Sequence, residues 1–502
     1  MNDKTKIKSI FAFLLILFQS ITYGQVHIGK FLESENCPLD LPDGLTIGEN
    51  FKFGYVDVPE IHNDSTSKSI RLAVAIFPCT NPDNAQEPLV MNTSGPGKSN
   101  MDNFIPQIAG GLGNYILPNR DIVIIELRGL RYSSSFLKSD EIFNANLEML
   151  GENPDYDESI ERLSRALKNT KMRFENSGIM LSAYNNIETS KDIHMVMDAL
   201  GYNSFSLVGS SAGTLVAHHV INENPERIRC AILDAGLPND PEILINYVPS
   251  IINCLKNYFE ECRQDSLCNA AFPDLEKRFI ELIEEFNDNP EKITLKNPET
   301  GEEFNVLING YRLSELVFFN MFYSTQIPLF IGKIVNGEHS ALKDFASGKI
   351  TSRNFADGLG YTIFIDEAGE YSSNDIDIDP NYKTFAEGIT LSGLGGKFLL
   401  EVQKQWELKF ISAESNSGDE THNTPVLVLN GKYDPVIPVK FDAVLKKKYP
   451  NSYIYRFNGV PHSAFDNATS CVLPMVLEFL NNPDSAPNSD CMSSFEQEYL
   501  VE

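Results

Sequence analysis

Short runs of apolar, β-branched residues recur along the chain, each bounded by glycine, proline or asparagine. Segments with apolar residues at helical spacing separate these runs, as in 188–200, where Ile193, Val196 and Met197 precede Gly201. Strands that alternate with helices predict a mostly parallel sheet with helices on both faces, which is the α/β fold class. The predicted strands are Ile70–Phe77, Leu89–Thr93, Ile122–Leu127, Phe205–Val208, Cys230–Leu233, Pro425–Leu429 and Tyr453–Phe457.

The alternation stops after Asp234 and resumes at the apolar run PVLVLNG. Between these points the chain has apolar residues at helical intervals, with polar, turn-rich stretches at 289–303 and 372–382. This pattern predicts a core formed by residues 25–237 and 425–502, with a helical cap domain inserted over 238–424. A chain of 502 residues is long enough to form both.

The first 24 residues have the pattern of a secretory signal peptide. Lys4, Lys6 and Lys8 precede an apolar run over 10–18, and the small residue Gly24 stands at a suitable cleavage point. That run is short for a bilayer span, and no later stretch is apolar for long enough. We therefore expect an exported protein, periplasmic or secreted, with no membrane anchor after the signal is removed.

Acidic residues outnumber basic ones, at 69 against 41, and the formal net charge is −28. Nucleic-acid binding requires stripes of lysine and arginine, which this sequence lacks, so nucleic acid is not an expected partner. We interpret the charge as a contribution to solubility. The sequence leaves the oligomeric state open.

The eight cysteines are informative because disulfides persist outside the cytoplasm. The segments between them favour two bridges, Cys262–Cys268 and Cys471–Cys491. A third bridge between Cys37 and Cys79 is an open alternative. Cys230 lies inside an apolar run and is expected to be a buried free thiol.

The segment FSLVGSSAGTLVAHHV places a GxSxG pattern between a predicted strand and a predicted helix. Gly209 and Gly213 would let strand and helix pass closely at a sharp turn, on which Ser211 stands above the sheet. The N–H of Ala212, at the start of the helix, would point toward a developing oxyanion. This context favours Ser211 as a nucleophile over an ordinary glycine-rich turn.

Two more candidate residues follow predicted strands later in the chain. Asp434 lies in the loop NGKYDPVIP, and His462 follows the turn FNGVP. The order Ser, Asp, His, with each residue placed after a strand, predicts a catalytic triad. Asp434 would fix the imidazole tautomer, and His462 would be the general base for Ser211.

The early segment LVMNTSGPGKSN supplies a candidate for the second oxyanion donor. Gly95 follows a strand there and would offer its N–H without a side chain in the way of the substrate. A tight Gly-Pro turn is the structural reading of the same residues, and the two are compatible. The HExxH pattern of a metal hydrolase is missing, so we expect neither a metal nor any other cofactor.

Taken together, SGPG, IIELRGLRYSS, LVGSSAGT, ILDAG, NGKYDPVIP and GVPH resemble the tripeptidyl aminopeptidase and proline iminopeptidase group of α/β-hydrolases. The resemblance covers nearly all of the mature chain, including the C-terminal region typical of that group. It implies the α/β-hydrolase fold with an inserted helical cap, and a triad of Ser211, Asp434 and His462. It also implies an oxyanion hole formed by Gly95 and Ala212.

The resemblance extends to supporting features. Arg128 and Gly129 match the group's RG turn, which would support the site, and the cap and C-terminal cysteine pairs look like the group's bridges. The sequence departs from the group at Ser94, where glycine is usual, and at Ala212, where a bulky tyrosine is usual. Neither change removes a backbone donor, but both would reshape the acyl pocket.

The resemblance implies an aminopeptidase that releases short or proline-ended peptides from free N-termini. In such enzymes carboxylates of the cap hold the substrate's ammonium, and we hypothesise that Asp366 or Glu367 does so here, although both can also be ordinary surface acids. A carboxylesterase or other small-ester hydrolase is the alternative, because fold and triad do not fix the leaving group. The small Ala212 favours that alternative, while the intact triad argues against a non-catalytic binding protein.

Overall fold

The computed structural model describes residues 28–92, 95–240, 243–296, 301, 303–351, 355–368, 378–393, 395–406 and 420–501. The proposed signal peptide (1–24) and Ser94 lie outside these ranges, as does Thr93, the last residue of one predicted strand. Each of the seven predicted strands is present, with slightly different ends.

Nine strands form one sheet within the described residues, in the order β1-β2-β3-β5-β4-β6-β7-β10-β11. The pairs β1/β2, β2/β3 and β3/β5 are antiparallel, and every pair from β5 to β11 is parallel. The first two strands of the sheet, β1 and β2, were not predicted from the sequence. The bounds are β1 Phe31–Glu33, β2 Lys52–Pro59, β3 Ser69–Phe77, β4 Leu89–Asn92, β5 Ile122–Ile125, β6 Phe205–Ser210, β7 Ile228–Asp234, β10 Val426–Gly431 and β11 Ser452–Phe457.

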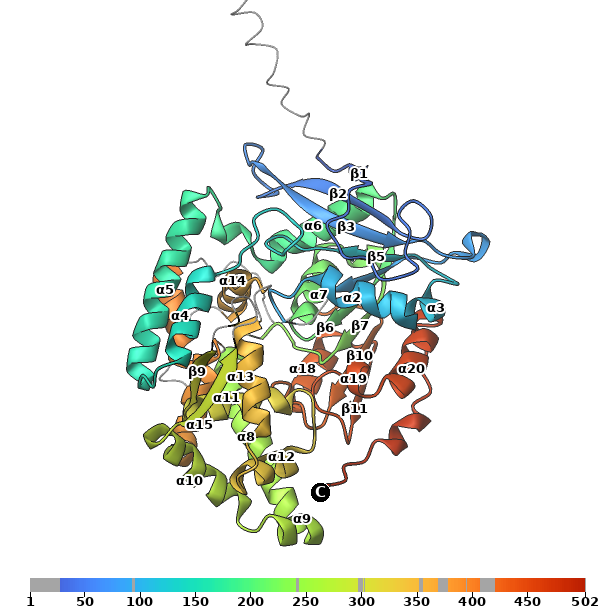
Figure 1. Cartoon of the computed structure of the whole chain (residues 1–502). Coiled ribbons are helices and arrows are strands. Elements are labelled where there is room, and N and C mark those ends of the chain that lie inside the picture. Colours follow the sequence, from blue (N-terminus) through green and yellow to red (C-terminus); the bar gives the residue numbers. More distant parts are fainter. Residues whose placement is uncertain are drawn as a thin grey trace, which may run out of the picture.

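Helices cover both faces of the sheet (Figure 1). One face packs against apolar residues of α6 and α7, such as Val196 and Val220, and the other against α2, α3 and α20, through residues such as Phe104 and Phe479. Because the central strands are covered on both sides, they read as continuous apolar runs, which is why the sequence revealed them. The bounds are α2 Asn100–Gln107, α3 Gly113–Ile116, α6 Asn186–Ala199, α7 Ala212–Glu223, α18 Lys440–Lys448, α19 Ala464–Asn467 and α20 Thr469–Asn481.

Between β7 and β10 the chain leaves the sheet and forms a group of helices with its own apolar core (Figure 1). β8 (Glu291–Lys296) pairs in a two-stranded hairpin with β9 (Glu303–Ile308), and it lies within the stretch 289–303 that was expected to be polar and turn-rich. The expected extent of a separate cap domain, 238–424, stays a prediction. The helices are α8 Ile243–Gln264, α9 Ser266–Ala271, α10 Leu275–Asp288, α11 Gly310–Met321, α12 Ile327–Val335, α13 Ser340–Thr351, α14 Asp357–Ala368, α15 Lys383–Leu391 and α16 Gly396–Trp406.

Two helices that precede the nucleophile in sequence, α4 (Asp140–Leu150) and α5 (Tyr156–Asn176), lie beside this group (Figure 1). The Ser164 hydroxyl of α5 donates to Glu401 of α16 at 2.7 Å, and the Trp406 indole donates to the Leu167 carbonyl. The helices between β7 and β10, called the cap below, therefore pack against helices from an earlier stretch of sequence.

The disulfide predictions are confirmed at two pairs and wrong at the third. Cys262–Cys268 and Cys471–Cys491 are bonded, whereas Cys37 and Cys79 are free. Cys230 is a buried free thiol, as expected. In the part of the chain that the structure describes, no helix is both long and apolar enough for a membrane span.

Candidate active site

Ser211 stands at a sharp turn between β6 and α7. Its φ is 52°, a left-handed conformation that costs a non-glycine residue on the order of 1–3 kcal/mol and is typical of a nucleophile elbow. A Cβ at Gly209 would lie 2.6 Å from the Gly213 carbonyl oxygen, so only glycine permits this close approach of strand and helix. The backbone forms the sharp turn between strand and helix that the sequence predicted, and the role of Ser211 as nucleophile stays a prediction.

Asp434 and His462 meet, as predicted, at the same edge of the sheet. The His462 Nδ1 donates to Asp434 Oδ2 at 2.7 Å, while Asp434 Oδ1 accepts the N–H groups of Val436 and Ile437 at 2.9 and 3.0 Å. The two backbone donors fix the carboxylate, and the carboxylate fixes the imidazole tautomer. The Nε2 of His462 is thereby left as the acceptor nitrogen.

The charges around His462 set its protonation. Burial lowers the pKa of His462, but the charge and hydrogen bond of Asp434, together with the charge of Asp234, outweigh burial and raise it above its usual range. Among the described residues, no hydrogen bond joins the Ser211 hydroxyl to His462. Such bonds are often long until a substrate is bound.

The predicted oxyanion donors lie together. Gly95, Ala212 and Gly213 line a narrow cavity of about 20 Å³, which Leu359 and Ile363 of α14 cover from the cap side. The loop that carries Gly95 is fixed to the cap, because the Ala356 N–H donates to the Gly97 carbonyl at 2.9 Å.

Arg128, which the RG turn suggested as a support for the site, holds elements of the core together, and its role toward the site stays a prediction. It is fully buried and makes two hydrogen bonds to Asp192 of α6, each 2.7 Å long. It also donates to the carbonyls of Glu60 and Ala183. Arg128 thus joins the end of β5 to β2 and α6 and makes none of these bonds to the triad.

A family model described as the alpha/beta hydrolase fold matches residues 87–469 of this chain. The chain belongs to the alpha/beta hydrolase family. The match includes all the candidate site residues named above, and the sheet order, helical layers and strand-end positions agree with it.

Two relatives indicate different chemistries within the alpha/beta hydrolase family. The chain is 26% identical over 250 residues to the serine protease Hip1 of Mycobacterium tuberculosis, a match that covers 47% of this chain and 45% of the relative. The chain thus spans less than half the length of this relative. It is 38% identical over 56 residues to the pimeloyl-[acyl-carrier protein] methyl ester esterase of Legionella pneumophila, covering 11% and 23% of the two chains.

Solved structures of hydrolases also match. An esterase from Exiguobacterium antarcticum superposes with a TM-score of 0.36 at 12% identity, covering 82% of this chain and 96% of that one. A meta-cleavage product hydrolase from Pseudomonas fluorescens gives 0.36 at 12% identity, covering 82% and 94%.

The two acids proposed to hold a substrate amine are both buried. Glu367 Oε1 contacts His219 at 2.7 Å and accepts from Asn186 at 2.8 Å, and Oε2 accepts from Asn239 at 3.2 Å. Burial alone would raise the pKa of Glu367, but His219 and the two amides hold it below its usual range. The idea that Glu367 offers its carboxylate to a substrate therefore finds no support in the geometry, and Asp366 beside it is 2% exposed.

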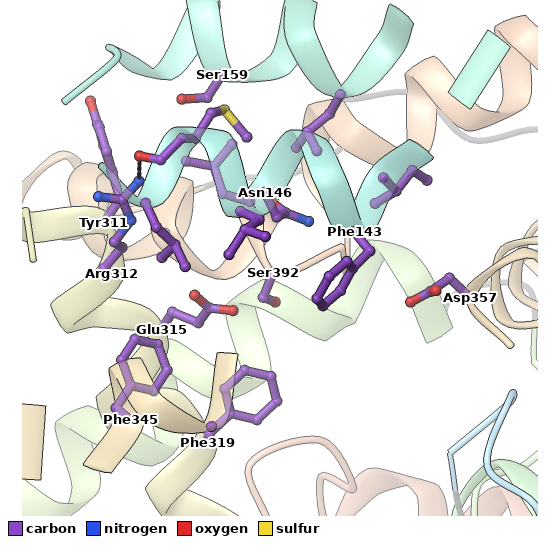
Figure 2. Close-up of a pocket in the computed structure, with 18 of the residues that line it drawn as sticks. Phe143, Asn146, Ser159, Tyr311, Arg312, Glu315, Phe319, Phe345, Asp357 and Ser392 are labelled. Carbon is purple, nitrogen blue, oxygen red and sulfur yellow. Dashed lines mark hydrogen bonds between the residues drawn. The ribbon is translucent and has the colours of Figure 1, made fainter. Parts of the chain in front are cut away.

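A larger cavity, of about 430 Å³, lies between α4, α5 and the cap helices (Figure 2). Its polar side chains include Glu315, Arg312 and Asp357. Figure 2 shows that the Glu315 carboxylate points into the cavity, toward the other labelled side chains. The guanidinium of Arg312 donates to the carbonyls of Met149 and Leu307, and burial lowers its pKa to about 10. The aromatic lining comes from Phe143, Tyr311, Phe319, Phe345, Phe355 and Tyr361.

Residues that line this cavity lie near the triad on one side and near the oxyanion loop on another. Phe319 of α11 lines the cavity, and Phe322, three residues later, places its ring edge-on to His462 with centroids 4.9 Å apart. Phe355 lines the cavity as well, and a Cβ at Gly97 would lie 3.0 Å from its ring. Sequence reasoning missed these residues because they come from segments without a motif.

Asp357 lines the cavity and is linked through the chain to the oxyanion loop. It directly follows Ala356, the residue bonded to Gly97. Burial raises the pKa of Asp357 to about 6, against hydrogen bonds from backbone N–H groups that lower it. A ligand cation beside this carboxylate would favour its ionised form.

Proposed function

We propose that this chain is an exported serine peptidase that releases short or proline-ended peptides from free N-termini. The observation that carries the hydrolase part is the Asp434–His462 pair beside the Ser211 turn, with Gly95 and Ala212 lining one narrow cavity. The likeness to a serine protease supports a peptide substrate over other acyl compounds.

The mechanism that we propose is two-step acyl transfer. His462 Nε2 takes the Ser211 proton as the hydroxyl attacks the substrate carbonyl, and the N–H groups of Gly95 and Ala212 hold the oxyanion. The imidazolium, stabilised by Asp434, protonates the leaving amine. Water then attacks the acyl-enzyme with His462 acting again as base, so the serine is restored.

The cavity supports the restriction to chain ends. It is bounded by cap helices on one side and α4 and α5 on the other, so it would accept the N-terminal part of a peptide on the acyl side of the scissile bond. We propose Asp357 as the group that binds the substrate's ammonium, in place of Asp366 or Glu367. An ammonium there would offset the cost of keeping this carboxylate charged and buried.

The test compares chromogenic amides of proline, alanine and Ala-Ala-Pro with free and acetylated N-termini, using the mature chain. We expect cleavage of the free-amine substrates, lost by on the order of 10⁶-fold in kcat in Ser211→Ala. Asp357→Asn should lower kcat/KM for free-amine substrates by about 10- to 100-fold and leave acetylated ones unchanged, because a charge-assisted hydrogen bond is worth roughly 1.5–3 kcal/mol. Asp198→Asn, at an exposed acid of α6, is the matched control.

A carboxylesterase is the second candidate, favoured by the ester-cleaving relative and by the small Ala212 beside the nucleophile. A short p-nitrophenyl ester, assayed beside the amides, separates the two functions. Ester turnover without amide cleavage would replace the peptidase proposal with an esterase. Activity that survives in Ser211→Ala would exclude Ser211 as the nucleophile.

A further inference from the structure

Asp234, the last residue of β7, is a second buried carboxylate at the active-site edge of the sheet. It is fully buried, and its Oδ2 accepts hydrogen bonds from the hydroxyls of Ser210 at 3.0 Å and Ser463 at 2.7 Å. Its Oδ1 accepts the N–H of Phe465 at 3.1 Å, and its main-chain carbonyl accepts the N–H of Ser211 at 2.8 Å. Ser210 ends β6 and Ser463 lies in the loop after β11, so one side chain of β7 joins turns that follow two different strands.

These partners are the immediate neighbours of the nucleophile and the base. Ser210 precedes Ser211, and Ser463 follows His462. Both Ser211 and Ser463 have positive φ angles, of 52° and 61°, and such conformations persist only where surrounding contacts hold them. The carboxylate of Asp234 therefore clamps the two strained turns that set the separation of nucleophile and base.

The same carboxylate adds a charge near the imidazole. The acids that act on His462 are Asp434 after β10, Asp234 at the end of β7 and the exposed Asp466 of α19. The cap contributes the uncharged ring of Phe322. On α8, burial raises the pKa values of Tyr247 and Cys254, which lie near Asp434, so both are neutral at working pH.

We propose that Asp234 is a positioning residue for the reaction, which locks the Ser211 turn to the His462 loop and supplies a second negative charge to the imidazolium. The proposal rests on the assignment of Ser211 and His462 made under the proposed function. Asp434 bonds directly to the imidazole. Asp234 instead acts through Ser210 and Ser463, which flank the nucleophile and the base, and through electrostatic attraction to the imidazolium. The sequence signal was an acid at the end of a predicted strand, in ILDAG.

The experiment uses the full mature chain with selectively labelled histidine, in the wild type and in Asp234→Asn, Ser463→Ala, Ser210→Ala and Asp198→Asn. The titration of His462 is followed by NMR, so the reading does not depend on which substrate is cleaved. We expect Asp234→Asn to lower the pKa of His462 by roughly half a unit to one unit, because it removes a negative charge that favours the protonated imidazole. Ser463→Ala and Ser210→Ala should leave that pKa unchanged.

The second readout is the rate at which a fluorophosphonate reagent labels Ser211. Asp234→Asn and Ser463→Ala should each slow labelling by about tenfold or more, since each frees a strained turn. Asp198→Asn, at an exposed acid of α6 that is not among the acids acting on His462, is the control and should change neither reading appreciably. An unchanged His462 titration together with unchanged labelling in Asp234→Asn would overturn the proposal.

The serine variants keep the test decisive if Asp234→Asn does not fold, because each removes one bond and leaves the acid in place. Labelling of Ser211 at the wild-type rate in both Ser210→Ala and Ser463→Ala would then contradict the proposal. Failure of the peptidase assignment shows itself differently, as normal labelling of Ser211 without amide cleavage in the wild type.

Discussion

Two of the buried histidine–carboxylate pairs among the described residues have the same contact distance and different surroundings. His462 and Asp434 lie 2.7 Å apart at the edge of the sheet, and His219 and Glu367 lie 2.7 Å apart between α7 and α14. The acids are 6% and 4% exposed. Residue type, distance and burial therefore do not distinguish a candidate catalytic pair from one that joins two parts of the fold.

The difference lies in which nitrogen meets the acid. His462 uses Nδ1, which leaves Nε2 available on the far side of the ring, while His219 uses Nε2 and also contacts Asn239 through that same atom at 3.1 Å. A base needs its second nitrogen directed at the group it deprotonates. The first pair keeps Nε2 out of the contact with the acid, as a base requires, and the second is a closed contact between core and cap.

The largest expected difference between the pairs is in activity. Asp434→Asn should lower kcat by about 10⁴-fold, because the amide no longer selects the productive tautomer. Glu367→Gln should change kcat by less than about tenfold. Steady-state kinetics on the best substrate would measure both values of kcat. Losses of similar size in the two variants would contradict the view that only the His462–Asp434 pair is catalytic.

The next largest effect is on stability and comes from the His219–Glu367 pair. Glu367→Gln leaves His219 without its charged partner and should lower the free energy of unfolding by about 3 kcal/mol. Urea denaturation measures this loss. The control is Glu161→Gln, whose side chain is 74% exposed, with an expected change within about 0.5 kcal/mol.

The two pairs should also separate along the pH axis. The raised pKa of His462 means that kcat/KM falls as pH drops through that value, since the protonated imidazole cannot act as a base. The lowered pKa of Glu367 means that its stabilising effect is fully present above its unfolded pKa of about 4.3 and is lost as pH falls through the lower folded value. Activity should therefore disappear first.

A pH–rate profile and melting temperatures of the wild type and Glu367→Gln would show this order. The gap between their melting temperatures should persist at pH 5 and shrink below about pH 4. A gap that closes together with the loss of activity would contradict the separation of the two pairs.

The smallest effect concerns the aromatic contact that His462 has and His219 lacks. Phe322→Leu removes the edge-on ring and should lower kcat/KM by about two- to tenfold, since such contacts are worth roughly 0.5–1.5 kcal/mol. Phe304→Leu, the same change in the hairpin strand β9, is the control. A loss of the same size in both variants would assign the effect to general packing.

The three catalytic candidates could be predicted from the sequence because each one follows a strand. Ser211, Asp434 and His462 lie directly after β6, β10 and β11, and the carboxyl ends of parallel strands share one edge. The strands themselves were visible because burial on both faces leaves uninterrupted apolar runs. The missed β2, KFGYVDVP, begins with an exposed lysine and contains a buried aspartate, which weakened its apolar pattern.

The hairpin β8–β9 was missed for a related reason. Its first strand alternates exposed and partly buried residues, so only Leu295 among its six residues is buried. A polar strand of that kind resembles a loop in sequence, and its pairing with β9 depends on packing against helices far along the chain. The free state of Cys37 and Cys79 was likewise decided by where the fold places them.

Local sequence alone determined the turn at Ser211 and the strands that deliver Asp434 and His462 to one edge, because backbone geometry and strand burial depend on neighbouring residues. The tertiary structure decided that Glu367 is held by His219, that Asp357 and Glu315 share a cavity, and that Asp234 joins two loops. Such contacts join segments far apart along the chain, so their partners are chosen by packing, which no local pattern encodes.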